Sequence, residues 1–256
     1  MIDKATWKKL EKEWEKVGKV YQEPRRVEYR LKFFCEHALE YLKGKAVLEI
    51  GANAGVYSYC MTKVADAVIA VEPGNKIAKK PYKTSYYDQL RMTGLYVDKE
   101  EKYDDFFPVN ETVEKYCQYP RECVYTCFNA LVMSYVLYHL SNKEIDLLTE
   151  HILPKCGVVI IQTRNQKRPK KHNSYKFWKS DNVVKFFMSQ GFTSREIVWE
   201  KDRKFSLEMF FKPSLYNKEA SCNAQSASQP VKDSRLNTTK NAQANGTAPS
   251  ATSPTP

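Results

Sequence analysis

The spacing of hydrophobic residues changes near Gly44, which divides the chain into a helical beginning and an alternating remainder. Before Gly44, apolar residues recur every three or four positions, first over 7–17 and again over 27–42. This spacing predicts two amphipathic helices, and Gly18 and Pro24 interrupt the pattern between them. We therefore expect the first part of the chain to be helical and to pack one apolar face on a core.

After Gly44, short apolar segments alternate with helical stretches. Uninterrupted apolar runs of this length are typical of parallel strands that helices cover on both faces. The sequence predicts strands at 46–50, 67–71, 129–133 and 158–161, with a helix around Ile145, Leu148 and Ile152 before the last of them.

The end of the folded part has a different pattern. A helix over 183–190 is expected to end at Gly191, and two further strands are expected at 193–199 and 205–211. The five residues between these strands are too few for a crossover connection, so the pair should be antiparallel. The fold class predicted here is α/β, with a mostly parallel sheet, helices on both faces and a C-terminal antiparallel strand pair.

Length and composition bound the number of domains. The chain has 256 residues, of which 42% are hydrophobic, enough for one full-sized domain with a single core. From Asn217 onward no aromatic residue occurs, and such a segment cannot bury enough surface to offset its ordering entropy. We expect a helical cap or extension over 1–45, a domain over 46–216 and a disordered tail over 217–256.

The net charge of +11 comes largely from one stretch. Residues 164–179, called the basic stretch below, hold seven Lys and Arg residues and no Asp or Glu. Aromatic residues lie among them, so the stretch could hold phosphates and stack on a base or sugar; a solvated loop is the alternative. The seven cations are Arg164, Lys167, Arg168, Lys170, Lys171, Lys176 and Lys179.

The sequence also argues against some classes of protein. It contains no apolar run of about 18 residues, and its N-terminus is charged where a signal peptide is apolar, so we expect a cytoplasmic protein without membrane contact. The seven cysteines lack paired C-x₂-C spacing. Cys117, Cys123 and Cys127 come nearest to a cluster but have no fourth ligand at a suitable distance, so we predict buried thiols and no metal site.

The most informative motif is VLEIGANAGVYSY over 47–59. A strand contains Glu49 near its end, Gly51 and Gly55 frame a tight turn, and a helix is expected to follow. A turn without side chains lets a ligand lie against the main chain, and a helix start supplies N–H groups. The four-residue glycine spacing differs from the dinucleotide fingerprint G-x-G-x-x-G.

A second carboxylate follows the next predicted strand. Glu72 ends AVIAVEP over 67–73 and lies 23 residues after Glu49. A carboxylate in this position can accept hydrogen bonds from both hydroxyls of a ribose. Its alternative, a solvated acid at a strand end, is less favoured because the glycine turn precedes it at this spacing.

These residues together resemble the class I S-adenosylmethionine-dependent methyltransferases. Glu49-x-Gly51-x-x-x-Gly55 corresponds to motif I, Glu72 to the acid after the second strand, and FNALVMSYVLYHLS over 128–141 to the fourth strand and its loop. The sequence of motif I resembles the FkbM-type branch of this superfamily, whereas the downstream part is more similar to a general small-molecule methyltransferase domain. The resemblance implies a Rossmann-like seven-stranded sheet in which strand seven lies antiparallel beside strand five.

The resemblance also implies a cofactor, S-adenosyl-L-methionine, and residues that bind it. Glu72 would hold the ribose hydroxyls, and an acid after the third strand would meet the adenine. Of Asp98, Asp104 and Asp105, the last two are preferred for the adenine. The methionine and ribose part would lie against Glu49, Gly51, Asn53 and Gly55, with Ser134 beside the sulfonium.

The implied reaction moves a methyl group in line from a sulfonium to a nucleophile. The protein must align that nucleophile and, for an oxygen or unactivated nitrogen, remove its proton. His139 is the best-placed base, although it could instead be a packed helix-start residue. Tyr135 and Tyr138 could shape the acceptor pocket.

The sequence narrows the chemical class of the methyl acceptor. The fourth-strand loop reads Met133-Ser134-Tyr135-Val136, not the Asn/Asp-Pro-Pro-aromatic motif of enzymes that methylate exocyclic base amines. We expect a small or medium-sized acceptor such as an anionic metabolite or sugar derivative, contacted by Arg164, Lys167 and Arg168. An RNA-directed methyltransferase using the basic stretch, and a non-catalytic cofactor-binding partner protein, are the alternatives.

Overall fold

The computed structural model describes residues 24–53, 55–73, 105–118, 127–164, 180–199, 205–213 and 215. The predicted first helix, the expected tail over 217–256, Asp98, Asp104 and most of the basic stretch lie outside these ranges. The helical elements are α2 (Pro24–His37), η1 (Leu39–Leu42), α3 (Val56–Met61), α5 (Val113–Tyr116), η3 (Leu137–His139), α6 (Asn142–Leu147), η4 (Leu148–Ile152), η5 (Leu153–Lys155) and α7 (Ser180–Ser189). The strands are β1 (Ala46–Ile50), β2 (Ala67–Val71), β3 (Phe106–Val109), β4 (Ala130–Ser134), β5 (Val158–Arg164), β6 (Thr193–Trp199) and β7 (Phe205–Phe211).

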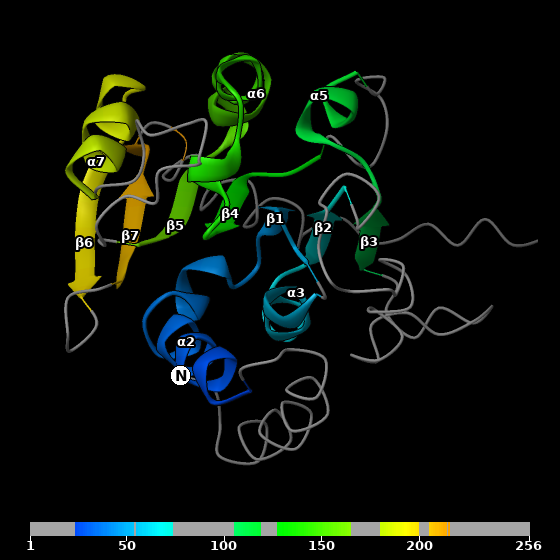
Figure 1. The fold of residues 1–256 in the computed structure, drawn as a ribbon, viewed down its shortest axis with the longest axis vertical. Coiled ribbons are helices and arrows are strands. Elements are labelled where there is room, and N and C mark those ends of the chain that lie inside the picture. Colours follow the sequence, from blue (N-terminus) through cyan, green and yellow to red (C-terminus); the bar gives the residue numbers. More distant parts are fainter. Residues whose placement is uncertain are drawn as a thin grey trace, which may run out of the picture.

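The seven strands form one sheet in the order β3-β2-β1-β4-β5-β7-β6 (Figure 1). The first five of these are parallel to one another, and β7 is antiparallel to both β5 and β6. The predicted α/β class, the mostly parallel sheet and the antiparallel final pair are therefore confirmed, as is the insertion of β7 beside β5.

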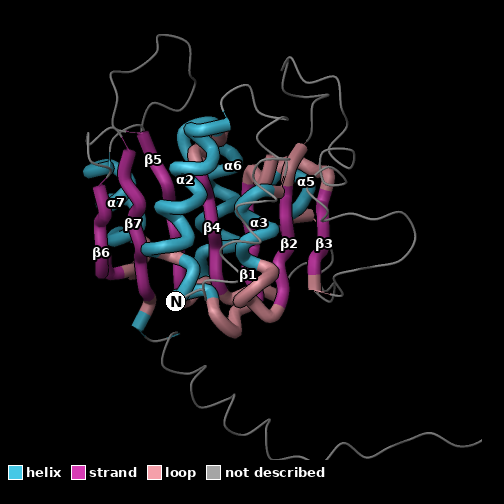
Figure 2. Tube along the Cα trace, turned by 90° about the horizontal axis from the view of Figure 1, so that it is seen from below, coloured by secondary structure: helices cyan, strands magenta, loops and turns pink. Residues whose placement is uncertain are grey.

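Helices cover the sheet on both faces, which gives three layers (Figure 1), and Figure 2 looks onto the face that α2 and α3 cover. On one face, α2, η1 and α3 pack on alternate strand residues such as Val47 and Val158. On the other, α5, α6 and α7 pack on the residues between them, such as Leu48 and Val159. Both sets of strand residues are buried, which explains why the parallel strands read as uninterrupted apolar runs.

Two differences from the predicted elements have local causes. The helix expected over 27–42 is divided after His37, and a short 3₁₀ turn, η1, then leads toward β1. The strand expected at 129–133 is shifted by one residue, to Ala130–Ser134. Asn129, just before it, accepts from the Ala46 N–H through its side chain at 3.1 Å and donates its own N–H to the Ala46 carbonyl at 2.9 Å. Asn129 therefore joins the starts of β1 and β4.

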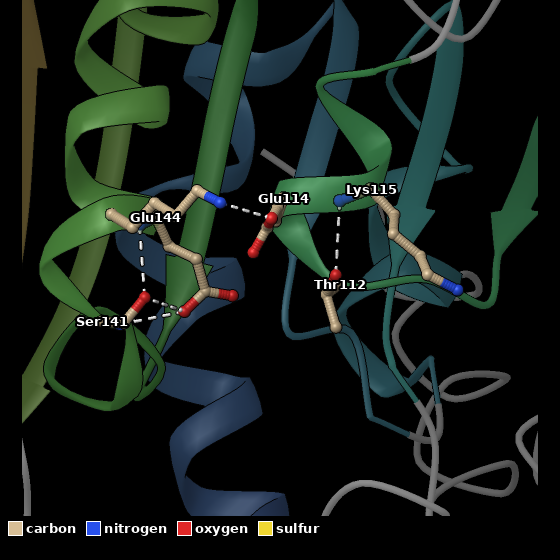
Figure 3. A network of polar contacts seen from close by, with 6 residues as sticks. Thr112, Glu114, Lys115, Ser141 and Glu144 are labelled. Carbon is tan, nitrogen blue, oxygen red and sulfur yellow. Dashed lines mark hydrogen bonds and ion pairs between the residues drawn. The ribbon is translucent and has the colours of Figure 1, made fainter.

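Side-chain caps fix the starts of two helices on the same face, α5 and α6 (Figure 3). Thr112 accepts from the Lys115 backbone N–H at 3.3 Å, and Ser141 forms a reciprocal capping box with Glu144. An ion pair of 2.6 Å from Lys143 to Glu114 joins the two helices. The loop after β4, which precedes Ser141, is thereby anchored at its far end.

The described residues test whether the cysteines are buried and whether any helix could span a membrane. Cys35, Cys60 and Cys156 are buried as predicted, whereas the prediction is wrong for Cys127, which is exposed before the start of β4. Burial raises the pKa of the half-buried Cys117 to about 11, so it remains a thiol. Cys123 is outside the described residues. Among the described helices, none combines the length and apolar composition needed to cross a bilayer.

Candidate active site

The parallel strands β1, β2 and β4 end at the same edge of the sheet, and the glycine turn lies at this edge. The N–H groups of Gly51 and Ala52 both donate to the Val71 carbonyl at the end of β2, at 2.8 and 3.3 Å. Gly55 closes the turn by donating to the Ala52 carbonyl at 2.9 Å. The turn between β1 and α3 is thus held by the end of the neighbouring strand.

Gly51 is required at its position for two reasons. Its φ of +78° is in the left-handed region that favours glycine. A Cβ added there would lie 2.6 Å from Cγ2 of Val136, in the loop after β4. The absence of a side chain at Gly51 therefore lets the β4 loop close on the turn.

Asn53 and Glu72 join the turn to the end of β2. The Asn53 backbone N–H donates to Oε2 of the Glu72 carboxylate at 2.9 Å. Glu72 is half-buried, and its own N–H donates to the Val109 carbonyl at the end of β3. Oriented with its amide nitrogen toward β2, Asn110 donates to the Glu72 carbonyl at 3.1 Å. The carboxylate predicted to bind ribose is consequently fixed beside the glycine turn.

Glu49 provides a second acid, buried one strand away. Its side chain is 1% exposed and accepts a hydrogen bond from the Ser58 hydroxyl of α3. Loss of solvent on burial raises the pKa of Glu49 from 4.5 to about 7, opposed by the Ser58 hydrogen bond and reinforced by the negative charge of Glu72. Glu49 therefore titrates near neutral pH, a property that its position in the motif did not predict.

The β4 loop supplies the remaining predicted residues. Ser134 ends β4, and its buried Oγ has no hydrogen-bond partner among the described residues. Tyr135 follows with a φ of +61°, which is rare for an aromatic residue. Tyr138 is buried, whereas His139 is exposed at the end of η3 and its ring contacts that of Tyr138 at 4.4 Å between centroids.

The placement of Asp105 contradicts its predicted role. Asp105 precedes β3, and its carbonyl accepts from the Val68 N–H at the start of β2. It therefore lies at the opposite edge of the sheet, about 13 Å from the end of the four-residue strand at a rise of about 3.3 Å per residue. The residues that follow β3 are Asn110 and Glu111, and Asp104 lies outside the described residues.

The residues predicted to contact the acceptor are only partly described. Arg164 ends β5, so its backbone lies at the same edge as Ser134, which pairs with the nearby Gln162. Lys167 and Arg168 lie outside the described residues. The arrangement as a whole brings together Glu49, Gly51, Asn53, Gly55, Glu72 and Ser134 at one edge of the sheet.

Comparison with solved structures identifies the fold. The N-methyltransferase NodS from Bradyrhizobium japonicum WM9 in complex with S-adenosyl-L-homocysteine aligns with a TM-score of 0.54 at 15% identity, covering 81% of this chain and 98% of that one. A second NodS structure aligns with a TM-score of 0.50 at 12% identity, covering 73% and 96%. The chain has the class I methyltransferase fold.

Other methyltransferase structures align with lower TM-scores. Magnesium protoporphyrin IX methyltransferase (ChlM) from Synechocystis PCC 6803 with bound SAM aligns with a TM-score of 0.48 at 13% identity, covering 73% of this chain and 78% of that one. No protein-family model matches the chain, and no curated protein matches it significantly. The methyltransferase fold predicted from motif I and Glu72 is confirmed, while its FkbM-like branch stays a prediction.

Proposed function

We propose that this protein is an S-adenosyl-L-methionine-dependent methyltransferase that acts on a small or medium-sized acceptor. The proposal rests chiefly on the hydrogen bond from Asn53 to Glu72, which joins the glycine turn to the carboxylate after β2. This unit offers an acceptor for two ribose hydroxyls beside a turn in which Gly51 and Gly55 carry no side chains. The methyltransferase fold, shared with NodS in complex with S-adenosyl-L-homocysteine, supports the same class of cofactor.

The residues at the edge suit the parts of that cofactor. Glu72 would hold the ribose, and Gly51, Asn53 and Gly55 would lie along the ribose and methionine. Glu49 on β1 pairs with Val132 on β4, two residues before Ser134, so Glu49 and Ser134 lie on the same face of neighbouring strands. The buried Ser134 hydroxyl has no partner among the described residues, so it can bind a polar ligand atom where the cofactor and the acceptor meet.

Catalysis by such a protein depends on alignment and proton removal. The cofactor supplies a methyl group activated by the sulfonium. Residues of this chain hold the acceptor nucleophile in line with that methyl group and take up its proton where it carries one. We assign proton removal to His139, which is exposed in the loop after β4, and shaping of the acceptor pocket to Tyr135 and Tyr138.

RNA is a second candidate acceptor because of the basic stretch. Arg164, the first of its seven cations, ends β5, and the carboxyl end of β5 lies at the edge described above. Phosphate contacts of this kind would make binding strongly dependent on salt. A non-catalytic protein that binds the cofactor would use the same Glu72 carboxylate and glycine turn. Only a measurement of turnover distinguishes that role from catalysis.

Cofactor binding tests the premise shared by these functions. We expect calorimetry to detect binding of S-adenosylhomocysteine to the wild type, strong weakening in Glu72→Ala and weaker loss in Glu72→Gln, which keeps an acceptor for the Asn53 N–H. Glu40→Ala, which removes an exposed acid from η1, should bind as the wild type does. Equal binding by wild type and Glu72→Ala would contradict the proposal.

Transfer of a labelled methyl group into a fractionated cell extract identifies the acceptor class. Label in the small-molecule fraction supports the first candidate, and label in RNA supports the second. In the RNA case, neutralising Lys167, Arg168, Lys170 and Lys171 should weaken binding and flatten its salt dependence. Cofactor binding without transfer into any fraction would favour the non-catalytic role.

A further inference from the structure

Two polar side chains, Ser134 and Gln162, lie next to each other on the sheet face that α2 covers. They are direct partners in the pairing of β4 with β5. Two positions earlier on each strand, Val132 and Ile160 are fully buried in the core that includes α2. Because side chains alternate along a strand, Ser134 and Gln162 point to this same face.

The buried amide of Gln162 has no partner within the described part of the chain. Gln162 is 1% exposed, and neither its Oε1 nor its Nε2 makes a hydrogen bond there. The Oγ of Ser134 is in the same condition, and the partner of Gln162 on β7 is the apolar Leu207. Burying an amide without partners costs stability, and a leucine would avoid that cost. Gln162 is therefore better explained by a ligand than by packing.

Arg30 brings a positive charge to these two residues. It projects from α2, where Leu31 and Phe34 are fully buried, and its guanidinium carbon lies 4.3 Å from the centre of the Tyr135 ring. Tyr135 follows Ser134 directly, and its N–H donates to the Gln162 carbonyl at 2.9 Å. The left-handed backbone of Tyr135 carries strain of the kind that concentrates at functional sites.

We infer that Arg30, Ser134 and Gln162 bind a carboxylate group of the methyl acceptor, which makes the acceptor a small carboxylic acid. The inference rests on the proposed function, because it takes this edge as the place of methyl transfer. A guanidinium, a hydroxyl and an amide nitrogen are all hydrogen-bond donors, and a charge-assisted bond from Arg30 to a carboxylate is about twice as strong as a bond between neutral groups.

The position of Gln162 assigns the carboxylate to the acceptor rather than to the cofactor. Glu72 follows β2, and Gln162 lies on β5, three strands further along the sheet. At about 4.8 Å between neighbouring strands, about 14 Å separates the two positions. The cofactor's methionine part would occupy the interval over β1 and β4, so that Gln162 lies on its far side.

Benzoate and its neutral isostere benzamide test this site, each titrated into protein saturated with S-adenosylhomocysteine. We expect benzoate to bind and benzamide to bind much more weakly. Arg30→Gln should weaken benzoate by about tenfold or more, since it removes a charge-assisted bond. Lys32→Gln makes the same charge change at an exposed position of α2 and should leave benzoate binding unchanged.

Gln162→Leu separates a ligand role from a structural one. Removal of an unpartnered buried amide should raise the melting temperature while abolishing benzoate binding. A lower melting temperature with benzoate binding retained would overturn the inference, as would equal affinities of the wild type for benzoate and benzamide.

A comparison of two cofactor analogues tests whether Arg30 binds the carboxylate of the cofactor instead of that of the acceptor. 5′-Methylthioadenosine lacks the carboxylate of S-adenosylhomocysteine. If Arg30→Gln weakens the binding of S-adenosylhomocysteine but not that of 5′-methylthioadenosine, Arg30 holds the carboxylate of the cofactor and the acceptor assignment is overturned. If the wild type fails to bind S-adenosylhomocysteine, the proposed function itself fails, whereas loss of benzoate discrimination with cofactor binding intact defeats only this inference.

Discussion

The backbone N–H of Asn53 donates to Oε2 of Glu72 at 2.9 Å across 19 residues of sequence. The N–H has this direction because Asn53 adopts a φ of +53°, in the left-handed region. Asparagine and glycine enter that region readily, whereas β-branched residues do not. The orientation of the proposed ribose-binding carboxylate thus depends on the backbone conformation of one residue in the turn.

Substitutions at Asn53 should follow that conformational preference. We expect Asn53→Gly to unfold in urea with nearly wild-type stability and to retain binding of S-adenosylhomocysteine. Asn53→Val should lose about 1–2 kcal/mol of unfolding free energy and bind the cofactor product more weakly. Equal stability and affinity of the two variants would show that the turn does not depend on the left-handed residue.

The contact between Gly51 and Val136 predicts a steric penalty that a matched glycine lacks. Gly51→Ala combines the left-handed conformation with a 2.6 Å approach to Val136, so we expect a loss of about 2–4 kcal/mol. Gly44→Ala has a similar φ, +67°, but its nearest neighbour is 4.0 Å away, so only about 1–2 kcal/mol should be lost. Urea unfolding of both variants measures the difference.

A second substitution checks the origin of that difference. Val136→Ala removes the Cγ2 contact but leaves Cβ of residue 136 at 2.8 Å from the added methyl. The double variant Gly51→Ala/Val136→Ala should therefore recover only part of the loss. Strictly additive effects of the two substitutions would contradict close packing of the β4 loop on the turn.

Glu49 predicts a dependence of stability on pH. Because its pKa is raised from 4.5 to about 7, the folded protein holds a proton on Glu49 that the unfolded chain releases between these values. Its contribution to the free energy of unfolding is complete below pH 4.5 and is lost as pH rises to about 7, by up to about 3 kcal/mol.

Glu49→Gln isolates this contribution, because the amide stays neutral and can still accept from Ser58. Relative to wild type, the variant should gain stability as pH rises from 5 to 8 in denaturant unfolding. Glu40→Gln, at an exposed position, should follow the wild-type curve. A constant difference between Glu49→Gln and wild type across this range would mean that Glu49 ionises normally.

His139 predicts a catalytic defect without a binding defect. If His139 removes the acceptor's proton, His139→Ala should lower kcat by about 100-fold or more and leave the affinity for S-adenosylhomocysteine unchanged. His151→Ala changes another histidine, half-exposed at η4, and should retain wild-type kinetics. A wild-type kcat in His139→Ala would assign that residue a packing role.

The strands and the glycine turn were predictable because their signals are local. Strands buried on both faces are apolar along almost their whole length, so the bounds of the strands at 46–50 and 67–71 were predicted to the exact residue. The β3 strand carries no such signal. β3 is an outermost strand of the sheet, includes Pro108 and is only half-buried. Because no apolar run marks β3 in the sequence, the prediction that Asp105 follows this strand is wrong, and Asp105 precedes it.

Other features of the site depend on pairings that the sequence does not carry. The contact of Gly51 with Val136 requires β1 and β4 to be neighbours, and the approach of Arg30 to Tyr135 requires α2 to pack on a particular face. The raised pKa of Glu49 likewise results from burial by α3. None of these follows from residue type or spacing along the chain alone.

The position of β7 has a consequence for how the protein is made. Along the chain, β7 comes last among the described strands, but it lies between β5 and β6 in the sheet. During synthesis, the outer edge of β5 is left without its partner until residues 205–211 leave the ribosome, and β6 must wait for the same partner. An apolar strand with an open edge is a template for pairing with other chains. The nascent chain therefore passes through an aggregation-prone interval that closes only when its final strand emerges.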